Sequence, residues 1–589
     1  METGVSRAGG LTLPPPLSAT EATCCKQLAA DLQLPLVIAK ILFRRGLVSA
    51  EAARRFLQPQ LADLPAPSAM KGLDKAADLL AEAVVRRRQI VIHGDYDVDG
   101  ITATVLLADF LRKTGLEPIY HLPNRLTDEY GLTMKSVAAL AALVLMPALL
   151  ITVDCGISTP KEVRYAQSLG FTVIITDHHE PPAAAADFPL ADAVVNPRQA
   201  GCAFADGELA GVGVAFFLLV ALRRKLVEKG WWTQDKMPNL RDSLDLAALG
   251  TIADVMPLTG VNRVLVRAGL EVISGRGRPG IAALCERAGL REDSVSAENV
   301  AYQLGPRINA AGRLGNPQLA ADLLLTQDMG AAAVLAEELE AANILRRELE
   351  AEVLEAALQQ AEQQVAAGQG SLVLQGPDWH PGVIGIIASR MIDRFHLPSL
   401  VFTGDSGQEG MLKGSGRSVP GLNLHQVLEQ CRAWIVHFGG HAMAAGLTVR
   451  NEDFAQFRTA FAEAVRALGG GLPKAGISID AVLDEQTDFR ELASSLRLLE
   501  PFGQGNPEPV FLLRNIRLRE VNTLREHLRF AVPLNGGMVK GIGFFMAAHF
   551  EAAAEGAVDL AFRLKESSYR GVSRVEVHAA AILSGKNLS

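Results

Sequence analysis

Acidic and histidine side chains recur just after short apolar segments in this 589-residue chain. The segments read QIVIHGDYDVDG, ALLITVDCGIS, FTVIITDHHEPP and LAALGTIADVMPL. Their acids and histidines are His93, Asp95, Asp97, Asp99, Asp154, Asp177, His178, His179 and Asp254. So many carboxylates in one place would repel one another unless cations held them together. The pattern therefore indicates hard divalent metal ions and chemistry on phosphate.

The first three segments are β-branched apolar runs, which predicts that each forms a buried strand ending just before its acid. Helical patterns alternate with these strands, as in a doubly wound parallel α/β sheet. Ligands bind at the carboxyl edge of such a sheet. We therefore expect the acids of these segments to meet at that edge, together with Asp254, which follows a predicted helix.

The predicted metal ligands are His93, Asp97, Asp99, Asp154, His178 and Asp254. Alternate residues of a short turn can face one cleft, and Asp154 is the candidate for a ligand that bridges two ions. In a two-metal site, the ions polarise both the attacking water and the leaving oxygen. Imidazole ligands shift the preference from Mg²⁺ toward Mn²⁺.

Three further residues of the same segments, His179, Asp177 and Asp95, are predicted to be catalytic. His179 would act as a base or orient the substrate, and its alternative is a structural histidine. For any single Asp after a strand, the alternative is the N-cap of a helix. Independent caps would not require paired histidines or acids at three successive strand ends, so the set as a whole favours the metal site.

Two glycine-containing segments and one histidine suit the binding of phosphate, which is best held by Arg, hydroxyl and backbone N–H groups. The candidates from GPRINAAGR, KGSGRS and FGGHAMAAG are Arg307, Arg313, Ser415, Arg417, Ser418 and His441. KGSGRS is predicted to be a loop whose glycines let backbone donors approach a ligand. Its alternative is an ordinary surface turn. The alternative for His441 is a structural histidine at a helix N-terminus.

Composition excludes several classes of protein. Lys plus Arg is 57 and Asp plus Glu is 65, a net charge of −8, which does not indicate a protein that coats nucleic acid. The six cysteines form no CxxC pair, so neither a zinc ribbon nor a disulfide framework is predicted, and a reducing cytoplasm is expected. The N-terminus lacks the pattern of a signal peptide. Residues 137–153 carry no charge, but Pro147 divides them, which predicts a helix, a turn and a strand rather than a membrane span.

The chain divides into five predicted parts. Residues 1–75 contain many prolines and are partly helical, with a disordered start through residue 18. Residues 76–330 form the doubly wound α/β domain. Residues 331–370 begin with a run free of Pro and Gly, which predicts one long connecting helix. Residues 371–470 form a second, glycine-rich α/β domain, and residues 471–589 read as the short strands of an oligonucleotide-binding (OB-like) β-barrel.

The motifs also resemble a known family. DYDVDG, VDCG, the DHH triplet and IADVMPL are similar to the four motifs of the DHH phosphoesterase superfamily. DWHPGVIGIIASR, KGSGRS and FGGHAMAAG resemble its DHHA1 partner domain. The order of these parts, with a long helix between them and a barrel carrying LEPFGQGNPEPVF, resembles a bacterial family of single-strand-specific exonucleases.

This resemblance implies a 5′ to 3′ exonuclease on single-stranded DNA that depends on Mn²⁺ or Mg²⁺ and releases nucleoside 5′-monophosphates in DNA repair and recombination. The ligands that it implies are Asp97, Asp99, Asp154, His178 and Asp254, with His93. Arg125 in PNRLTDEYG would contact phosphate, although the family more often has Gly at the position of Glu129. It also implies cooperation with a single-strand-binding protein and a RecQ-type helicase.

Two other functions remain open at this point. The metal motifs alone also fit a small-substrate phosphoesterase that acts on pyrophosphate, short oligonucleotides or cyclic dinucleotides. The additional barrel argues against it, because a small substrate needs no extended track. A non-enzymatic replication scaffold, as found among inactive DHH relatives, conflicts with the intact acids Asp97, Asp99, Asp154 and Asp254.

Overall fold

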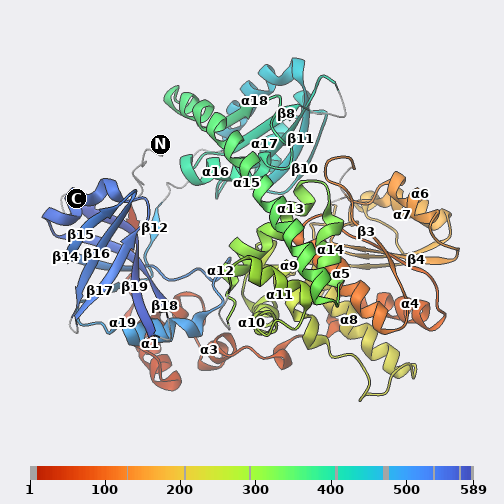
Figure 1. Ribbon diagram of the computed structural model, residues 1–589, viewed down its shortest axis with the longest axis horizontal. Helices are drawn as coiled ribbons and strands as arrows, with labels where there is room; N and C mark the ends of the chain where they lie inside the picture. The colour runs from red at the N-terminus through yellow and green to blue at the C-terminus, as the bar shows by residue number, and fades with distance from the viewer. Residues whose placement is uncertain are drawn as a thin grey trace. The chain divides into compact units, whose positions relative to one another are not determined.

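The computed structural model describes residues 10–128, 131–182, 184–204, 207–290, 294–404, 409–468, 476–534, 537–569 and 572–584. Contacts divide the chain into two compact units, and Figure 1 labels many of their helices and strands. The smaller unit comprises Met1–Gln60, Lys474–Phe502 and Asn506–Ser589, and the larger comprises Leu61–Pro473 and Gly503–Gly505. The limits of the five parts drawn from the sequence remain predictions.

A five-stranded parallel sheet with the order β3-β2-β4-β5-β6 forms the centre of the larger unit. Its strands are β2 (Ile90–His93), β3 (Ile119–His121), β4 (Ala148–Val153), β5 (Phe171–Thr176) and β6 (Ala193–Val195). β2 and β4 are buried along their whole length, as expected for parallel strands that are covered on both faces. The predicted doubly wound sheet is confirmed.

Helices cover both faces of this sheet. They are α4 (Leu73–Val85), α5 (Val98–Lys113), α6 (Met134–Ala141), α7 (Pro160–Ser168) and α8 (Gly211–Glu228). Ile92 and Ile151 lie in one apolar core with residues of α4, α5 and α8, whereas Val91 and Leu150 lie in another with residues of α6 and α7. Successive side chains of a strand point to opposite faces, so each strand contributes to both cores.

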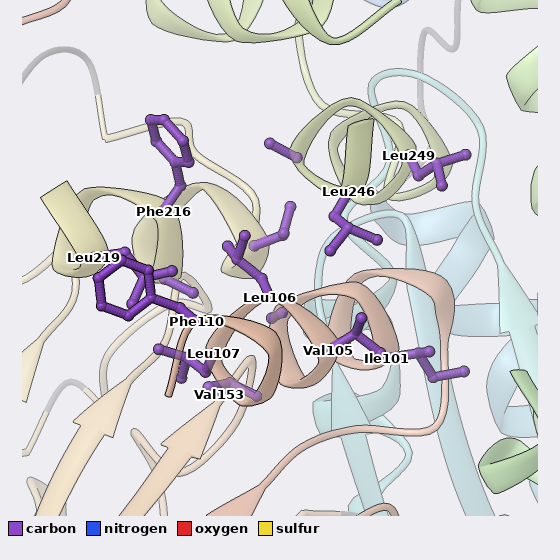
Figure 2. Close-up of a cluster of buried hydrophobic side chains, with 14 of the residues drawn as sticks. Ile101, Val105, Leu106, Leu107, Phe110, Val153, Phe216, Leu219, Leu246 and Leu249 are labelled. Carbon is purple, nitrogen blue, oxygen red and sulfur yellow. The ribbon is translucent and has the colours of Figure 1, made fainter. Parts of the chain in front are cut away.

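Helix α5 follows the first acidic segment and packs in the core on one face of the sheet. In Figure 2, the apolar side chains of α5 lie among Val153 of β4, Phe216 of α8 and Leu246 of α9 (Leu244–Ala253). Because α5 is packed on several sides, its first turn is held at a fixed place relative to the strand ends.

Helices continue through the remainder of this domain. They are α10 (Gly260–Ser274), α11 (Pro279–Arg287), α12 (Ala297–Asn299), a π-helical turn (Val300–Leu304), α13 (Gly305–Arg313) and α14 (Pro317–Leu325). The predicted long connecting helix is α15 (Met329–Ala366), which has 38 residues. Asp328 caps it by accepting a hydrogen bond from Ala331 N at 2.7 Å.

The uncharged run of residues 137–153 forms the end of α6, a turn at Met146–Pro147 and strand β4. The predicted helix, turn and strand are therefore confirmed. In the part of the chain that the structure describes, no helix is long and apolar enough to cross a membrane.

A second sheet, with the order β10-β11-β9-β8-β7, follows α15. Its strands are β7 (Leu372–Gln375), β8 (Ser399–Gly404), β9 (Met411–Arg417), β10 (His437–Gly440) and β11 (Ala444–Arg450). Its helices are α16 (Ile384–Phe395), α17 (Leu424–Gln430) and α18 (Phe454–Leu468). The prediction that KGSGRS is a loop is wrong, because these residues lie mainly in β9 between β8 and β11. Its glycines leave room for neighbouring apolar side chains, since a Cβ on Gly414 would clash with Phe402.

The smaller unit contains a seven-stranded sheet with the order β13-β14-β18-β19-β17-β16-β15. Its strands are β13 (Ala481–Leu483), β14 (Phe511–Ile516), β15 (Arg519–Leu524), β16 (His527–Leu534), β17 (Gly537–Gly543), β18 (Val558–Tyr569) and β19 (Val572–Ser584). Its helices are α1 (Ala19–Leu32), α2 (Leu36–Arg44), α3 (Ala50–Leu57), α19 (Phe489–Leu496) and α20 (Phe550–Glu555).

The start of the chain corrects one expectation. β1 (Leu11–Thr12) pairs in parallel with β12 (Ile477–Ser478), although the sequence predicted disorder through residue 18. Pro15 O also accepts a hydrogen bond from Arg44. Pairing with a second segment far along the chain gives this Pro-rich stretch an order that its local sequence does not indicate. Residues 1–9 lie outside the described residues.

Candidate active site

Neighbouring strand ends bring the predicted acids together. β4 lies between β2 and β5, and the parallel register sets His93 beside Thr152. Asp154 follows β4 directly, at the centre of the carboxyl edge. It has a left-handed backbone conformation with a φ of 59°, which Asp tolerates better than most residues. Asp254 reaches the same place as the C-cap of α9.

Ligand atoms come within 4.8 Å of one another in three overlapping groups of the described residues. The groups are Asp95, Asp97 and Asp154; Asp154, His178 and His179; and Asp99, His178 and Asp254. Because Asp154 and His178 each belong to two groups, the residues form one continuous cluster. His178 Nε2 lies 3.1 Å from Asp154 Oδ1 and 3.7 Å from Asp254 Oδ2.

The carboxylates of the cluster disfavour one another's charge. Burial, followed by the charge of Asp97, raises the pKa of Asp95 to about 8 and that of Asp99 to about 7. Burial and then the charge of Asp99 raise the pKa of Asp254 to about 9 and also raise the pKa of Asp154. A bound cation would remove both penalties, because it replaces lost hydration and offsets the negative charge.

Backbone N–H groups fix two of these acids. Asp99 accepts hydrogen bonds from Gly211 N at 2.6 Å and Val212 N at 2.8 Å, at the start of α8. Asp97 caps α5 by accepting a hydrogen bond from Gly100 N at 3.0 Å. A carboxylate has two oxygens and about four acceptor sites, so capping and metal binding are compatible roles for Asp97.

Asp177 holds His179 in place. Its Oδ1 accepts hydrogen bonds from His178 N, His179 N and His179 Nδ1, the last at 2.8 Å, and its Oδ2 accepts one from Ile157 N. Burial alone would raise the pKa of Asp177, but the hydrogen bond and charge of His179 lower it to about 2. Asp177 belongs to none of the three ligand groups among the described residues. The structure places it behind His179.

The structure gives the predicted ligand His93 other partners. Its Nε2 lies 3.2 Å from Gly131 O, and its Nδ1 lies 3.1 Å from Nδ1 of His121, whose ring stacks on it. Both ring nitrogens of this fully buried side chain therefore contact other protein atoms, and His93 does not join the ligand groups of the described residues. Asp95, predicted as catalytic, instead joins a ligand group.

Three arginines face the acids across one pocket of about 280 Å³. Its lining residues are Asp95, Tyr96, Asp97, Arg125, Asp154, His179, Ala253, Asp254, Asn309, Arg313 and Arg417. Burial and then the charges of Arg125 and Arg417 lower the pKa of Arg313 to about 9. Burial and Arg125 also lower the pKa of Arg417. The arginines therefore repel one another in a buried place, which favours a bound anion.

The second α/β domain contributes Arg417 of strand β9 to this pocket. Arg417 Nη1 donates hydrogen bonds to Gly416 O at 2.8 Å and to Ser415 Oγ at 3.3 Å. A Cβ built on Gly385, near the start of α16, would lie 3.0 Å from Ser415 Oγ, so this helix approaches closely. His441 lies between β10 and β11 rather than at a helix N-terminus, and its ring stacks on His179 with centroids 5.6 Å apart.

Two predicted phosphate contacts are not brought to the pocket. Arg307 is buried, pairs with Glu340 of α15 and donates a hydrogen bond to Gln303 O at 2.7 Å. Ser418 is buried and donates its hydroxyl hydrogen to Leu422 O at 2.7 Å. Both side chains use polar atoms to hold neighbouring backbone or helices, and neither is among the residues that line the pocket. Glu129 lies outside the described residues.

Sequence reasoning missed three pocket residues, Tyr96, Ala253 and Asn309. Arg125 lies over the Tyr96 ring at 5.2 Å, and Asn309 Oδ1 accepts a hydrogen bond from Val98 N at 3.2 Å. Helical spacing could have found Asn309, because residues four apart share a helix face and Asn309 is four residues before Arg313. The same spacing places Arg307 on another face.

Comparisons with known proteins define the class. The chain matches the DHH family, N-terminal domain, over residues 89–251 and the DHHA1 domain over residues 368–467. It matches the RecJ OB domain over residues 479–580. The acid and histidine cluster at the edge of a parallel sheet is thus that of a DHH-class protein with a DHHA1 partner domain.

Relatives narrow this class. The chain is 38% identical to the single-stranded-DNA-specific exonuclease RecJ of Salmonella typhimurium, over 95% of this chain and 97% of the relative. It is 35% identical to the RecJ of Bacillus subtilis but spans only 64% of that longer protein. The crystal structure of RecJ in complex with Mn²⁺ from Thermus thermophilus superposes with a TM-score of 0.82 and 32% identity, over 98% of this chain and 80% of that one. The chain belongs to the RecJ family.

Proposed function

We propose that this protein is a metal-dependent exonuclease that degrades single-stranded DNA from 5′ to 3′ and releases nucleoside 5′-monophosphates. The observation that carries the proposal is the pocket in which the acid and histidine cluster faces Arg125, Arg313 and Arg417. One wall suits divalent cations and the other suits a phosphodiester. Relatives of nearly equal length are named single-stranded-DNA-specific exonucleases, which supports the substrate class.

The cluster fits divalent metal ions. Its donors are carboxylate oxygens and imidazole, and the buried Asp154 Oδ1 accepts no hydrogen bond from the described residues. Related crystal structures contain Mn²⁺ or Mg²⁺. The residues that would hold two such ions are Asp97, Asp99, Asp154, His178 and Asp254, with Asp95 beside them. When bound, the ions polarise the attacking water and stabilise the leaving oxygen.

The side chains of the pocket orient the scissile phosphodiester. Arg313 and Arg125 offset its negative charge and hold its oxygens by charge-assisted hydrogen bonds. His179 lines the same pocket, with Nδ1 bonded to Asp177. This bond fixes the orientation of the ring, and we assign His179 to hold or deliver a proton at the reacting phosphate. Asp177 thus acts as a positioning residue for His179.

Direction requires a second anchor, because both strand ends flank the same kind of phosphodiester. Arg417 lines the pocket, and Ser415 lies two residues before it on β9 and accepts a hydrogen bond from Arg417 Nη1 at 3.3 Å. A terminal 5′-phosphate carries about −2 charge, which suits a guanidinium and a hydroxyl. We assign these two residues to the 5′-phosphate.

The C-terminal barrel contacts the part of the DNA strand that lies beyond the pocket. The biological setting follows from the substrate. We propose a role in DNA repair and recombination in the cytoplasm, where a RecQ-type helicase and a single-strand-binding protein would supply and cover the single strand. This part of the proposal is contradicted if neither partner co-purifies with the intact protein from a cell extract.

The proposed activity is tested by digesting 5′- and 3′-labelled oligonucleotides with Mn²⁺, as single strands and as blunt duplexes. We expect mononucleotides to be released from the 5′ end of single strands only. Release from the 3′ end would reject the direction. Cleavage restricted to dinucleotides or pyrophosphate would instead identify a small-substrate phosphoesterase.

A further inference from the structure

The helix that delivers Asp254 ends in an unusual way. α9 closes with the paired hydrogen bonds of a Schellman motif, from Val255 N to Ile252 O at 3.1 Å and from Met256 N to Thr251 O at 3.2 Å. In this motif, the residue after the cap has a left-handed backbone and is usually Gly. Here that residue is Val255, with a φ of 57°.

Valine is among the residues least suited to this conformation. Its two γ-carbons crowd the backbone when φ is positive, so a β-branched residue there is a genuine outlier. Asp154 of the acid and histidine cluster also has a left-handed backbone, but Asp enters the left-handed region more readily than Val. The fold alone therefore favours Gly at position 255.

Packing does not explain the valine either. The Val255 side chain is 66% exposed, whereas Met256 and Leu258 just after it are buried. An exposed isopropyl group adds little to the core, so replacing it would not open a cavity. The strain is thus not explained by burial of the Val255 side chain.

The surrounding loop keeps the backbone from relaxing. Leu258 N donates a hydrogen bond to Gln504 O at 2.7 Å, and Asn262 Nδ2 donates one to Pro257 O at 3.0 Å. Residues 253 and 254, which directly precede Val255, line the metal pocket. A strained and exposed apolar residue therefore directly follows two residues of the proposed active site. Strain of this kind concentrates at functional sites.

We propose that Val255 contacts the substrate and provides an apolar contact surface for the sugar or base of the nucleotide that enters the pocket. This inference rests on the proposed function. The arginines and the metal cluster recognise phosphate, but the nucleoside also needs a partner that excludes water. A valine provides van der Waals contact to any base, which suits an enzyme that must accept every sequence.

The test separates strain from contact with three variants at this position. Val255→Gly removes both the strain and the side chain, Val255→Ala keeps a non-glycine residue but removes the γ-carbons, and Val255→Ile keeps a branched apolar group. Steady-state kinetics on a 5′-phosphorylated oligothymidylate strand and thermal unfolding midpoints are measured for each. The matched control is His396→Gly, which relieves a left-handed C-cap on α16 away from the pocket.

We expect both Gly variants to raise the unfolding midpoint slightly, by roughly 1–2 °C, because each relieves backbone strain. Val255→Gly and Val255→Ala should raise KM roughly three- to tenfold with kcat nearly unchanged, since a contact made equally in the ground and transition states is lost. Val255→Ile should keep the KM of the wild type, and so should His396→Gly.

An unchanged KM in Val255→Gly and Val255→Ala would overturn the inference while leaving the proposed function intact, because the wild type would still digest the strand. A fall in kcat that excess Mn²⁺ restores would also overturn it, since Val255 would then act only by placing Asp254. If the wild type itself neither cleaves nor binds the strand, the proposed function fails, and the inference fails with it.

Discussion

The two walls of the pocket carry opposite charges and are built in opposite ways. The acidic wall comes from strand ends and helix caps of one sheet, where backbone N–H groups fix Asp97 and Asp99. The basic wall is assembled from separate parts of the chain: the segment after β3, the end of α13 and strand β9 supply Arg125, Arg313 and Arg417. The first wall depends on local geometry and the second on the packing of two domains.

Both walls are nevertheless unfavourable when empty. Burial and like charges raise the pKa of Asp254 and lower that of Arg313. Each wall therefore gains from a ligand of the opposite sign, cations for the acids and a phosphodiester for the arginines. Under the proposed function, the acidic wall would decide whether hydrolysis occurs, whereas the basic wall would decide which end of the DNA strand is presented to it.

The largest effect should come from the acidic wall. Asp154→Asn preserves shape but removes the charge shared by two ligand groups, so nucleotide release should fall by orders of magnitude. Release of labelled nucleotide with Mn²⁺ measures this, and circular dichroism shows whether the variant is folded. The control is Asp74→Asn, an acid in a surface ion pair with Arg224, which should keep full activity. Near-normal turnover of folded Asp154→Asn would reject the metal assignment.

An intermediate effect is expected at the basic wall. Arg417→Ala should slow digestion of 5′-phosphorylated strands roughly ten- to a hundredfold and that of 5′-hydroxyl strands much less, because one charge-assisted hydrogen bond is lost. Both substrates are compared at one salt concentration with a 3′ label.

A matched control for this change is the double variant Arg307→Ala with Glu340→Ala. It removes a buried ion pair without leaving a lone charge. It should leave the preference for a 5′-phosphate unchanged. If Arg417→Ala slows both substrates by the same factor, this residue is a general backbone contact, and the division between the two walls is less sharp than proposed.

Contacts outside the pocket should behave unlike either wall. Arg529 and Lys540 are exposed on one face of the neighbouring strands β16 and β17. Changing both to Ala should raise KM for long DNA strands several-fold and leave KM for very short ones unchanged. The slope of log affinity against log salt concentration should become less steep by roughly one to two. Equal loss on short and long strands would show that the barrel is not a track. Point variants are preferable to removing the tail, because Gln504 holds the loop beside Asp254.

The smallest effect concerns pH and stability without metal. The pKa of Asp99 is raised from 3.8 to about 7 and that of Asp254 from 3.8 to about 9. An acid whose pKa is higher in the folded state stabilises the fold below its unfolded pKa, and this stability is lost as pH rises through the folded pKa. In EDTA, the unfolding midpoint should therefore fall by a few degrees between about pH 6 and about pH 9.

Manganese should reverse this trend, because it binds the ionised acids. The midpoint measured by differential scanning calorimetry in saturating Mn²⁺ should rise relative to EDTA, and more so at higher pH. Asp154→Asn should flatten the dependence. A gain from Mn²⁺ that does not grow with pH would mean that the acids are already ionised without metal.

Much of the acidic wall could be predicted from the sequence because its geometry is local. A β-branched run followed by an acid places that acid at the carboxyl edge of a parallel sheet, whatever else surrounds it. Asp97, Asp99, Asp154 and His178 follow this rule and lie together. The run without Pro or Gly that forms α15 is equally local, since helix propensity accumulates along it.

The basic wall was less predictable because partners far along the chain decide where a guanidinium or hydroxyl is used. Arg307 and Arg313 belong to one short segment, yet Arg307 pairs with Glu340 while Arg313 lines the pocket. Ser418 bonds to Leu422 O although it adjoins Arg417, which lines the pocket. From residue type alone, such residues are equally good candidates for phosphate contacts, and only their packing in the folded protein distinguishes them.

The sequence by itself determined the residue types and the strand ends that create an acidic cluster, because chain direction and side-chain alternation are properties of each segment. Only the tertiary structure decided that His93 turns to His121, that KGSGRS lies mainly in strand β9 and that Val255 is held in a left-handed conformation. For His93 and KGSGRS the deciding contacts come from another segment of the chain, and their free energy outweighs the local preference. Val255 is held by the hydrogen bonds that close α9 and by the bond from Leu258 to Gln504 just after it.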